Sequence, residues 1–447
     1  MDSQPQKLSG SSADSISSAF NHFSVPPTQT SVSRGKYEEV QPSAGGSKFG
    51  TVEFVINPGD GIYTDLANSF LQLNVRVVNA TGDPLSATLG DVNVWAGDNF
   101  AHSLFEKVTV RLNDRDIEYH GNYNYWAYLS NRLNYDSETQ KTSLLASSGW
   151  FADDDVARDA NELTDPSIAR RKRLVSASKA LSFSTRLRLA FFSSDLYVFP
   201  GSKVTVALNR AAPAFALGAI DNTPVGGARI EITSATFHAL RLKVNASLLN
   251  AQVERALKGD RIRYPVRRVK DRTTMLVRGE RSATFVLPST KQCPSRCLVF
   301  FVNSEAAGGN YALNPYKFGN YDVTHLDCKV EGLGETIEYK TNFTTGEGLS
   351  LPYSQLMKLV GRFENDRPFS VSFEEWRTRS TIWAFDLSED KNRDGSTLQL
   401  IKSGRLTFSA RFANPLPHNV TVFFVTEQDD IIETGLDNAI STLVPVL

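Results

Sequence analysis

Two short-spaced pairs in the second half of the chain have the residue types of a zinc site. Cys293 and Cys297 are separated by three residues, and His325 and Cys328 by two. Structural zinc is usually held by four such thiolate or imidazole ligands. Cys297, however, begins the apolar run Leu298 to Val302, and Cys328 lies in a segment of alternating apolar and polar residues. Buried core thiols are the simpler interpretation, so we expect no metal and no other cofactor.

A second set of possible ligands lies nearer the end of the chain. Asp390, Asn392, Asp394 and Gly395 match the first half of a calcium-binding loop, in which oxygen ligands and a glycine follow one another at this spacing. The later position that supplies a bidentate Glu in such loops is Ile401 here. We interpret the segment as a polar loop between two strands.

Basic side chains gather in two segments. Residues 261 to 281 contain eight basic and two acidic side chains, and the candidate basic patch consists of Arg261, Arg263, Arg267, Arg268, Lys270 and Arg272. Such a patch can bind nucleic-acid phosphates, but it can equally form a contact between two domains, and the sequence leaves both alternatives open. The second cluster, Arg170 to Arg173, is expected to pair with the acidic segment Asp153 to Asp165 within a subunit or between subunits.

Histidine, which most hydrolytic and metal-dependent sites use, is rare and dispersed in this chain. The six histidines are His22, His102, His120, His238, His325 and His418. The chain has no Gly-x-Ser-x-Gly nucleophile elbow, no phosphate-binding Walker loop and no His-x-x-x-His pair, which are the spacings that these chemistries require. We therefore expect a protein that is not an enzyme.

The composition limits the class of protein further. In 447 residues, 48 Lys and Arg stand against 49 Asp and Glu, so the chain is not a polycation and any nucleic-acid contact must be local. Three cysteines suit a reducing compartment such as the cytoplasm or nucleus. The longest nearly apolar stretch, Ala211 to Ile220, is far shorter than the ~20 residues of a membrane span, so we expect none.

Alternation with a period of two dominates the chain after the first 34 residues, which are rich in Ser, Gln, Pro and Thr and are expected to form a mobile arm. Leu71, Leu73, Val75 and Val77, for example, alternate with polar residues, as in a strand with one buried face. Similar segments recur up to Val244 and again from Arg261 to Thr426. Many strands with few helices predict antiparallel sandwiches.

Only three segments have clear helical patterns. They are residues 123–133, 246–258 and 354–363. The second has Asn245 as an N-cap and Gly259 where a C-terminal glycine ends a helix, and it separates the two series of strands. The sequence therefore predicts a mobile arm (1–34), a first sandwich (35–244), a connecting helix (245–259) and a second sandwich (260–447).

A short internal similarity suggests that the two series are duplicates. Arg186 to Leu196 is followed by a turn and Val204, and Arg405 to Leu416 by a turn and Val420. In both copies a Phe precedes a Leu by four residues, and the copies lie 220 positions apart (Phe192 and Phe412). With the helix near mid-chain, this similarity favours two related β-domains in tandem.

A dozen short motifs, spread in one order from about Phe20 to Thr434, resemble those of a known family. In the first half they are Phe23-Ser-Val-Pro-Pro-Thr-Gln-Thr30, Gly50 to Ile56, Tyr63 to Leu71 and His102 to Asn113; in the second they include Asn245 to Leu249, Tyr264-Pro-Val-Arg-Arg268, Asn314-Pro-Tyr-Lys-Phe318, Ala384 to Leu387, Gly404 to Phe408 and Phe412 to Pro417. In these motifs the chain is similar to the major capsid proteins of Polinton (Maverick) elements and adintoviruses.

The resemblance implies a fold and a function. It implies an all-β fold, the double jelly roll, in which two eight-stranded antiparallel sandwiches stand in tandem with a few short helices, as in adenovirus hexon. It also implies a homotrimeric capsomer that tiles an icosahedral capsid around double-stranded DNA, in a virion assembled in the host cytoplasm or nucleus. The implied partners are further copies of the chain, a penton or minor capsid protein and the packaged DNA.

Permanent subunit interfaces are rich in aromatic anchors. The aromatic cluster Tyr119, Tyr123, Tyr125, Trp126 and Tyr128 is therefore the candidate interface, and a core capped by an aromatic helix is the alternative. A two-domain, lectin-like binding module is the alternative function. A metal-dependent β-sandwich enzyme is a third, which the scattered histidines disfavour.

Overall fold

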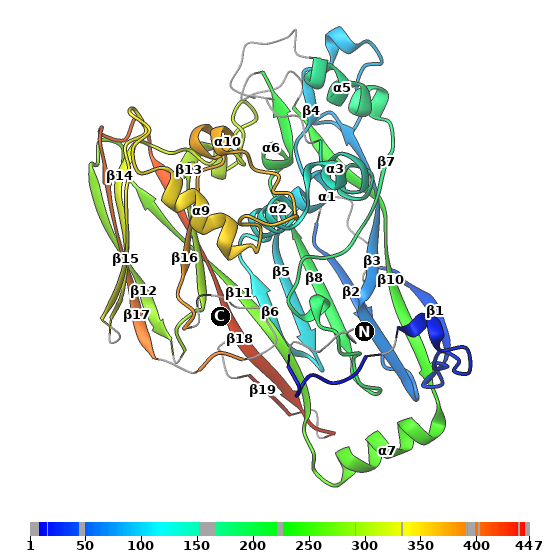
Figure 1. Cartoon of the computed structure of the whole chain (residues 1–447). Coiled ribbons are helices and arrows are strands. Elements are labelled where there is room, and N and C mark those ends of the chain that lie inside the picture. Colours follow the sequence, from blue (N-terminus) through cyan, green and yellow to red (C-terminus); the bar gives the residue numbers. More distant parts are fainter. Residues whose placement is uncertain are drawn as a thin grey trace, which may run out of the picture.

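The computed structural model of the chain describes residues 9–15, 17–43, 50–151, 166–220, 227–290, 292–331, 334–389, 391, 398–400, 403–436 and 439–442. These residues form two antiparallel β-sandwiches that stand side by side (Figure 1). No helix among them combines the length and the apolar composition that are needed to cross a membrane.

The first sandwich consists of two four-stranded sheets. One has the strand order β1-β10-β3-β7 and the other β2-β8-β5-β6. The bounds are β1 Val32–Val40, β2 Val52–Ile56, β3 Ile62–Val78, β5 Phe105–Leu112, β6 Arg115–His120, β7 Leu181–Thr185, β8 Val204–Arg210 and β10 Arg229–Val244. The short strands β4 (Val94–Ala96) and β9 (Leu217–Ala219) pair with each other apart from these sheets.

The second sandwich repeats this plan. Its sheets have the orders β11-β18-β13-β16, with β19 (Ile440–Thr442) added beside β18, and β12-β17-β14-β15. The bounds are β11 Ile262–Leu276, β12 Ser282–Thr290, β13 Arg296–Asn303, β14 Val323–Glu331, β15 Glu335–Lys340, β16 Ile382–Asp386, β17 Gly404–Phe412 and β18 Val420–Thr434.

The two sandwiches have the same topology. When the eight sandwich strands of each half are numbered in chain order, both halves pair as 1-8-3-6 in one sheet and 2-7-4-5 in the other. Identical crossovers in two consecutive halves are what duplication of one sandwich produces.

The sequence repeat that we expected is nevertheless wrong in its register. Residues 405–412 lie in β17, the seventh strand of the second set, whereas residues 186–196 lie before β8, which is the seventh strand of the first set. Val204 belongs to a seventh strand and Val420 to an eighth. The matching letters therefore occupy positions that are not equivalent, because strand-turn-strand units anywhere in a sandwich share the same alternating pattern.

Alternation correctly predicted the buried face of most strands. In β3, Leu71, Leu73, Val75 and Val77 are fully buried, and the residues between them are partly exposed. The same side chains form the first hydrophobic core together with residues of β5, β8 and β10. Not every strand was predicted: β6 and β15 are among those that were missed, and β1 begins at Val32, inside the segment expected to be an arm.

Helices are confirmed at all three predicted places, as α2 (Tyr123–Asn134), α7 (Ala246–Leu257) and α9 (Ser350–Leu359), but α9 begins and ends four residues before the predicted segment 354–363. The Asn245 side chain accepts a hydrogen bond from the main-chain N–H of Ser247 at the start of α7, and Gly259 has a positive φ of 98° just beyond its end. The other helices are α1 Phe100–Ser103, α3 Ser137–Thr139, α4 Leu145–Ser148, α5 Pro166–Val175, α6 Pro213–Ala216, α8 Ser304–Ala307 and α10 Phe373–Thr378. Helix α7 lies at one end of the molecule, and α2, α5, α9 and α10 lie toward the other (Figure 1).

Candidate functional site

Helix α2 joins the two halves because its side chains enter both hydrophobic cores. Tyr123 and Ala127 belong to the core of the first sandwich. Tyr125, Tyr128 and Leu129 belong to the core of the second. A helix encoded in the first half thus supplies buried apolar surface to both, and burial of this kind is the main stabilising contribution in folding.

Two aromatic rings of α2, those of Tyr125 and Tyr128, pack against aromatic residues of the second half. The Tyr125 ring lies 4.3 Å from the Phe423 ring and 5.9 Å from that of Phe300, between centroids. Tyr128 stacks on Tyr316 at 4.0 Å with an angle of 7° between the rings. Such contacts contribute beyond their buried area.

The predicted aromatic cluster is therefore divided between the interior and the surface. Tyr123, Tyr125 and Tyr128 are buried within one chain, which favours the alternative interpretation, an aromatic helix that caps a core. Trp126 and Tyr119 are partly exposed, and they remain the members of the cluster that a second subunit could contact.

The second half contributes to the first core in return. Strands β11 and β18 are paired along 15 residues, and Tyr264, Val266 and Ile432 at one end of this long ribbon lie in the core of the first sandwich. The Tyr264 hydroxyl accepts a hydrogen bond of 2.9 Å from the main-chain N–H of Phe199. The same ribbon at its other end, at Val269 and Val425, lies in the second core.

Polar groups reinforce this junction. Arg268 and Asp430, which are 2% and 0% exposed, form a buried ion pair with an Nε–Oδ2 distance of 2.8 Å. Arg268 Nη1 also donates to the main-chain oxygen of Ile117 in the first sandwich at 2.5 Å. Asp271 accepts a hydrogen bond of 2.6 Å from the Asn122 side chain at the start of α2. The basic segment therefore does make a contact between the two sandwiches, one of its two predicted alternatives.

The six residues of the predicted basic patch do not form one surface. Arg268 is buried, Arg263 pairs with Glu433 at 2.7 Å, and Arg267 and Lys270 are partly buried, whereas Arg261 and Arg272 are exposed. Burial, with the neighbouring Arg268 and Arg272 charges, lowers the pKa of Lys270 to about 8. Successive residues of a strand point to opposite faces of a sheet, which divides the patch between two faces.

Among the described residues, the four candidate zinc ligands do not form a group that could hold a metal ion. The half-buried Cys293 and the other two thiols are close enough to affect one another's pKa, but His325 lies apart from them. Cys297 and Cys328 are fully buried, and burial raises the pKa of both thiols, that of Cys328 to about 12. His325 is an odd number of residues from Cys328 on β14 and therefore points to the other face of the sheet. There its Nε2 lies 3.0 Å from Glu338 Oε1.

The other segments singled out in the sequence are only partly described. In the cluster 170–173, the buried Arg171 pairs with Asp98 at 2.7 Å, and Lys172 lies over the Trp95 ring. Residues 152–165, which hold the acidic segment, lie outside the described residues, as do Asp390, Asn392, Asp394, Gly395 and Ile401.

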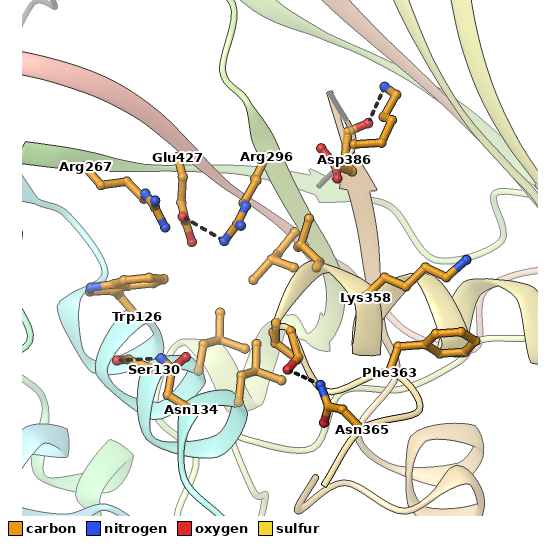
Figure 2. Close-up of a pocket in the computed structure, with 17 residues that line it drawn as sticks. Trp126, Ser130, Asn134, Arg267, Arg296, Lys358, Phe363, Asn365, Asp386 and Glu427 are labelled. Atoms are coloured by element: carbon orange, nitrogen blue, oxygen red, sulfur yellow. Dashed lines mark hydrogen bonds and ion pairs between the residues drawn. The ribbon is translucent and has the colours of Figure 1, made fainter. Parts of the chain in front are cut away.

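A groove runs along the junction between α2, α9 and the sheet that contains β11, β13 and β18. It consists of two adjoining cavities of about 670 and 430 Å³, which share the lining residues Trp126, Ser130, Asn134, Arg267, Arg296 and Glu427. Figure 2 shows Trp126, Arg267, Glu427 and Arg296 along one wall of the larger cavity and Lys358 with Phe363 on another. Sequence reasoning missed Arg296, Lys358 and Glu427, because they are single charges in three separate elements.

Solved viral structures are similar to this chain in fold over both of its sandwiches. A chain of the Sputnik virophage cryo-EM structure matches 100% of this chain and 95% of its own length, with a TM-score of 0.66 and 11% identity. The mavirus major capsid protein matches 98% of this chain and 96% of its own length, with a TM-score of 0.54 and 12% identity. A chain of the PBCV-1 virus capsid matches 94% of this chain and 98% of its own length, with a TM-score of 0.57 and 9% identity. The chain has the double jelly-roll fold.

The fold class predicted from the sequence is thus confirmed over both halves of the double jelly roll. At the level of sequence, a protein of Caenorhabditis elegans described as uncharacterised is 23% identical over 409 residues, which are 88% of this chain and 93% of the relative. No protein-family model matches the chain.

Proposed function

We propose that this double jelly-roll protein is a major capsid protein whose work is self-assembly rather than catalysis. The observation that carries the proposal is the identical strand order of two sandwiches fused through shared cores. It is supported by the similarity to the mavirus and Faustovirus major capsid proteins, each of which is matched over more than nine tenths of its length.

Three copies of such a chain form the capsomer in this proposal. Two similar sandwiches in each chain give a trimer six similar sides, so that one capsomer meets six neighbours through related contacts. A trimer of single sandwiches has three sides and lacks this property. Duplication of the sandwich therefore has a direct geometric use in tiling a closed shell.

The finer parts of the proposal follow from the sequence resemblance. The capsomers tile an icosahedral virion capsid around double-stranded DNA, with a penton or minor capsid protein at the vertices, after assembly in the host cytoplasm or nucleus. The source is an element or virus of the Polinton (Maverick) or adintovirus type. The relative in an animal, Caenorhabditis elegans, is compatible with a gene carried by an integrated element.

The native mass of the purified chain tests the proposal. A trimer has three times the 49.4 kDa mass of the chain, and negative-stain micrographs should show six-sided particles of that mass. A monomer that binds immobilised glycans would instead indicate the lectin-like alternative and overturn the capsid proposal.

A further inference from the structure

The smaller cavity of the junction groove, with a volume of about 430 Å³, is called the arginine cavity below. Among the described residues, the charged side chains that line it are Arg188, Arg267, Arg296 and Glu427. Three guanidinium groups thus face one carboxylate, which leaves an excess of two positive charges (three minus one). A cleft lined by one sign of charge attracts ions of the other sign, so the arginine cavity favours anions.

The three guanidinium groups of the arginine cavity have no hydrogen-bonded acceptor among the described residues. Arg296 comes nearest to having one, but its Nη1 lies 3.8 Å from Glu427 Oε2, which is too long for a hydrogen bond. The Nε atoms of Arg188 and Arg296 are also buried without a partner. Leaving buried donors without acceptors is costly.

The strand pairing offers Arg267 one further carboxylate. Asp429 of β18 lies opposite Arg267 of β11. Asp429 does not line the arginine cavity, however, and its Oδ2 accepts a hydrogen bond of 3.0 Å from the main-chain N–H of Gln399. The Arg267 guanidinium therefore remains available to a ligand.

Other arginines at the junction are paired with carboxylates of the chain itself. Arg268 binds Asp430, and Arg132 binds Glu375. The fold thus supplies a carboxylate to each of these two buried cations, and it supplies none within hydrogen-bond distance to the three arginines of the cavity. We take this difference as the sign of a site whose acceptor comes from outside the chain.

A flat apolar surface adjoins the three cations. The Trp126 indole lines the cavity on the side of α2, and Figure 2 shows it below Arg267 and Glu427. Its Nε1 donates a hydrogen bond of 3.0 Å to the main-chain oxygen of Arg188, which fixes the ring. Ser130 and Asn134 follow Trp126 at intervals of four residues, on the same face of the helix, and add polar groups to the lining.

The arginine cavity is formed by both halves of the chain. Arg188 and α2 belong to the first half, whereas Arg267, Arg296 and Glu427 come from β11, β13 and β18 of the second. The Arg188 guanidinium is held 5.0 Å from the centre of the Tyr135 ring, which also lines the cavity. Sites between two domains are common places for small ligands.

Charge and shape together select a class of ligand. A phosphate monoester carries about −1.5 to −2 charges at pH 7, which matches the excess of two cations, whereas a single carboxylate leaves one cation uncompensated. Arginine forks also bind phosphate oxygens in pairs. The volume of about 430 Å³ lies in the range of small-molecule sites, ~300 to 1,000 Å³, and leaves room for a flat ring beside the phosphate.

We propose that the arginine cavity binds a nucleoside monophosphate, with the phosphate between the three guanidinium groups and the base on the Trp126 indole. Stacking on an aromatic side chain stabilises any nucleobase, because every base has a π-face. The inference goes beyond the proposed capsid function and does not depend on the trimer.

Isothermal titration of the full-length protein with adenosine 5′-monophosphate (AMP) tests the site. Adenosine, ribose 5-phosphate and inorganic phosphate are the comparison ligands, because each carries only part of the chemistry of AMP. We expect AMP to bind with a dissociation constant of ~1 mM or less. Each comparison ligand should bind about tenfold more weakly or worse, since it loses either the stacking or the charge.

Variants of the lining charges supply the second readout. Arg267→Gln with Arg296→Gln should weaken the binding of AMP by about tenfold or more. Arg272→Gln is the matched control, because Arg272 lies on the same strand as Arg267, is exposed and lines neither cavity. It should leave the affinity unchanged. Melting of each variant without ligand shows whether the fold is kept.

Glu427→Gln is expected to act in the opposite direction. It removes the one carboxylate that repels the phosphate, and it should strengthen the binding of AMP by about threefold or more. A gain of affinity cannot arise from a damaged fold, so this variant remains informative even if the arginine variants are unstable.

The outcomes decide the inference without involving the capsid proposal. Equal affinities for AMP and inorganic phosphate would indicate an adventitious ion only and would overturn it. Binding of AMP that is unchanged in the arginine double variant, or weakened by Glu427→Gln, overturns it as well, as does the absence of binding at ~10 mM AMP. The native mass of the chain, which tests the capsid proposal, is measured separately and without nucleotide.

Discussion

The ring of Tyr125, from the helix after the fifth sandwich strand of the first half, packs 4.3 Å from the ring of Phe423 in the last long strand of the second half. Tyr125 is encoded in the first half, yet both rings lie in the core of the second sandwich. The two sandwiches of the double jelly roll are therefore joined by a shared hydrophobic interior as well as by the connecting helix α7. That helix has no buried residues.

Removal of the Tyr125 ring should be strongly destabilising, whereas removal of its hydroxyl should not. Tyr125→Ala is expected to lower the free energy of unfolding by ~3 to 5 kcal/mol, as for other large aromatic truncations. The Tyr125 hydroxyl is buried without a hydrogen-bond partner among the described residues, so Tyr125→Phe should leave stability unchanged or raise it by about 1 kcal/mol. Denaturant unfolding monitors both variants, and a loss of stability in Tyr125→Phe would contradict this account.

The buried pair Arg268 and Asp430 should behave asymmetrically on mutation. Asp430→Leu alone leaves the Arg268 charge buried without its partner, which should cost ~3 to 5 kcal/mol. The double variant Arg268→Met with Asp430→Leu removes both charges and should recover most of that loss. A double-mutant cycle in thermal or denaturant unfolding measures the difference. Simple additivity of the two single losses would show that the pair is not coupled.

His102 should make the fold sensitive to mild acid. Its Nδ1 lies 2.9 Å from the Tyr123 hydroxyl and its Nε2 lies 3.0 Å from the Thr185 hydroxyl. Burial, with a smaller contribution from the Arg188 charge, lowers the pKa of His102 to about 3. Between pH ~6.5 and that value the unfolded chain binds a proton that the folded chain does not, so stability falls as the pH decreases, by up to ~1.4 kcal/mol per pH unit.

The control for this pH dependence is His102→Gln. It should be less stable than the natural chain at pH ~7 because the hydrogen bonds change, but its stability should fall less steeply between pH ~6.5 and ~5. The free energy of unfolding from urea titrations, measured across that range, gives the two slopes. Parallel slopes would exclude His102 as their source.

Phe408 tests the strand register of the second sandwich. It is fully buried, and its ring lies 5.0 Å from that of Phe424 and 5.4 Å from that of Phe385. Phe408→Ala should cost ~3 to 5 kcal/mol. Val286, on the partner strand and 53% exposed, is the matched control, and Val286→Ala should change stability by no more than ~0.5 kcal/mol. Equal effects at both positions would refute the register.

Local alternation was sufficient to predict most strands. It failed where side chains, and not a neighbouring strand, accept the hydrogen bonds of the main-chain N–H groups. Leu187, Leu189 and Phe191 alternate like a strand, yet β7 ends at Thr185. The main-chain N–H of Arg188 donates to the Tyr123 hydroxyl, and those of Ala190 and Phe191 donate to the Glu118 carboxylate. A period of two reports which side chains are buried, and it does not report whether a neighbouring strand or a side chain accepts the hydrogen bonds.

The missed strand β15 has the opposite cause. In the segment Glu335–Lys340 only Ile337 and Tyr339 are apolar, because the strand lies at the edge of its sheet and pairs with β14 alone. A strand with one partner and charged residues on its open side resembles a polar loop in sequence. The inner strands of the same sheet, β14 and β17, have two partners each and were predicted.

The candidate site could be predicted only in part, since it depends on contacts between distant segments. The aromatic helix α2 was evident from its composition, but nothing near Tyr125 or Tyr128 indicates that Phe423 or Tyr316 covers them. The basic segment was likewise evident in the sequence. That Arg268 forms an interior ion pair whereas Arg267 lines the groove can be seen only once the pairing of β11 with β18 is known.

Strands β11 and β18 contribute side chains to the first core, and helix α2 contributes side chains to the second. This exchange has a consequence for how such genes diverge. Recombination that exchanged one half for that of a distant relative would leave Tyr264 and Ile432, or Tyr125 and Tyr128, facing cavities shaped for other side chains. The halves have the same topology, but each constrains the side chains of the other, and they should be inherited as one indivisible module.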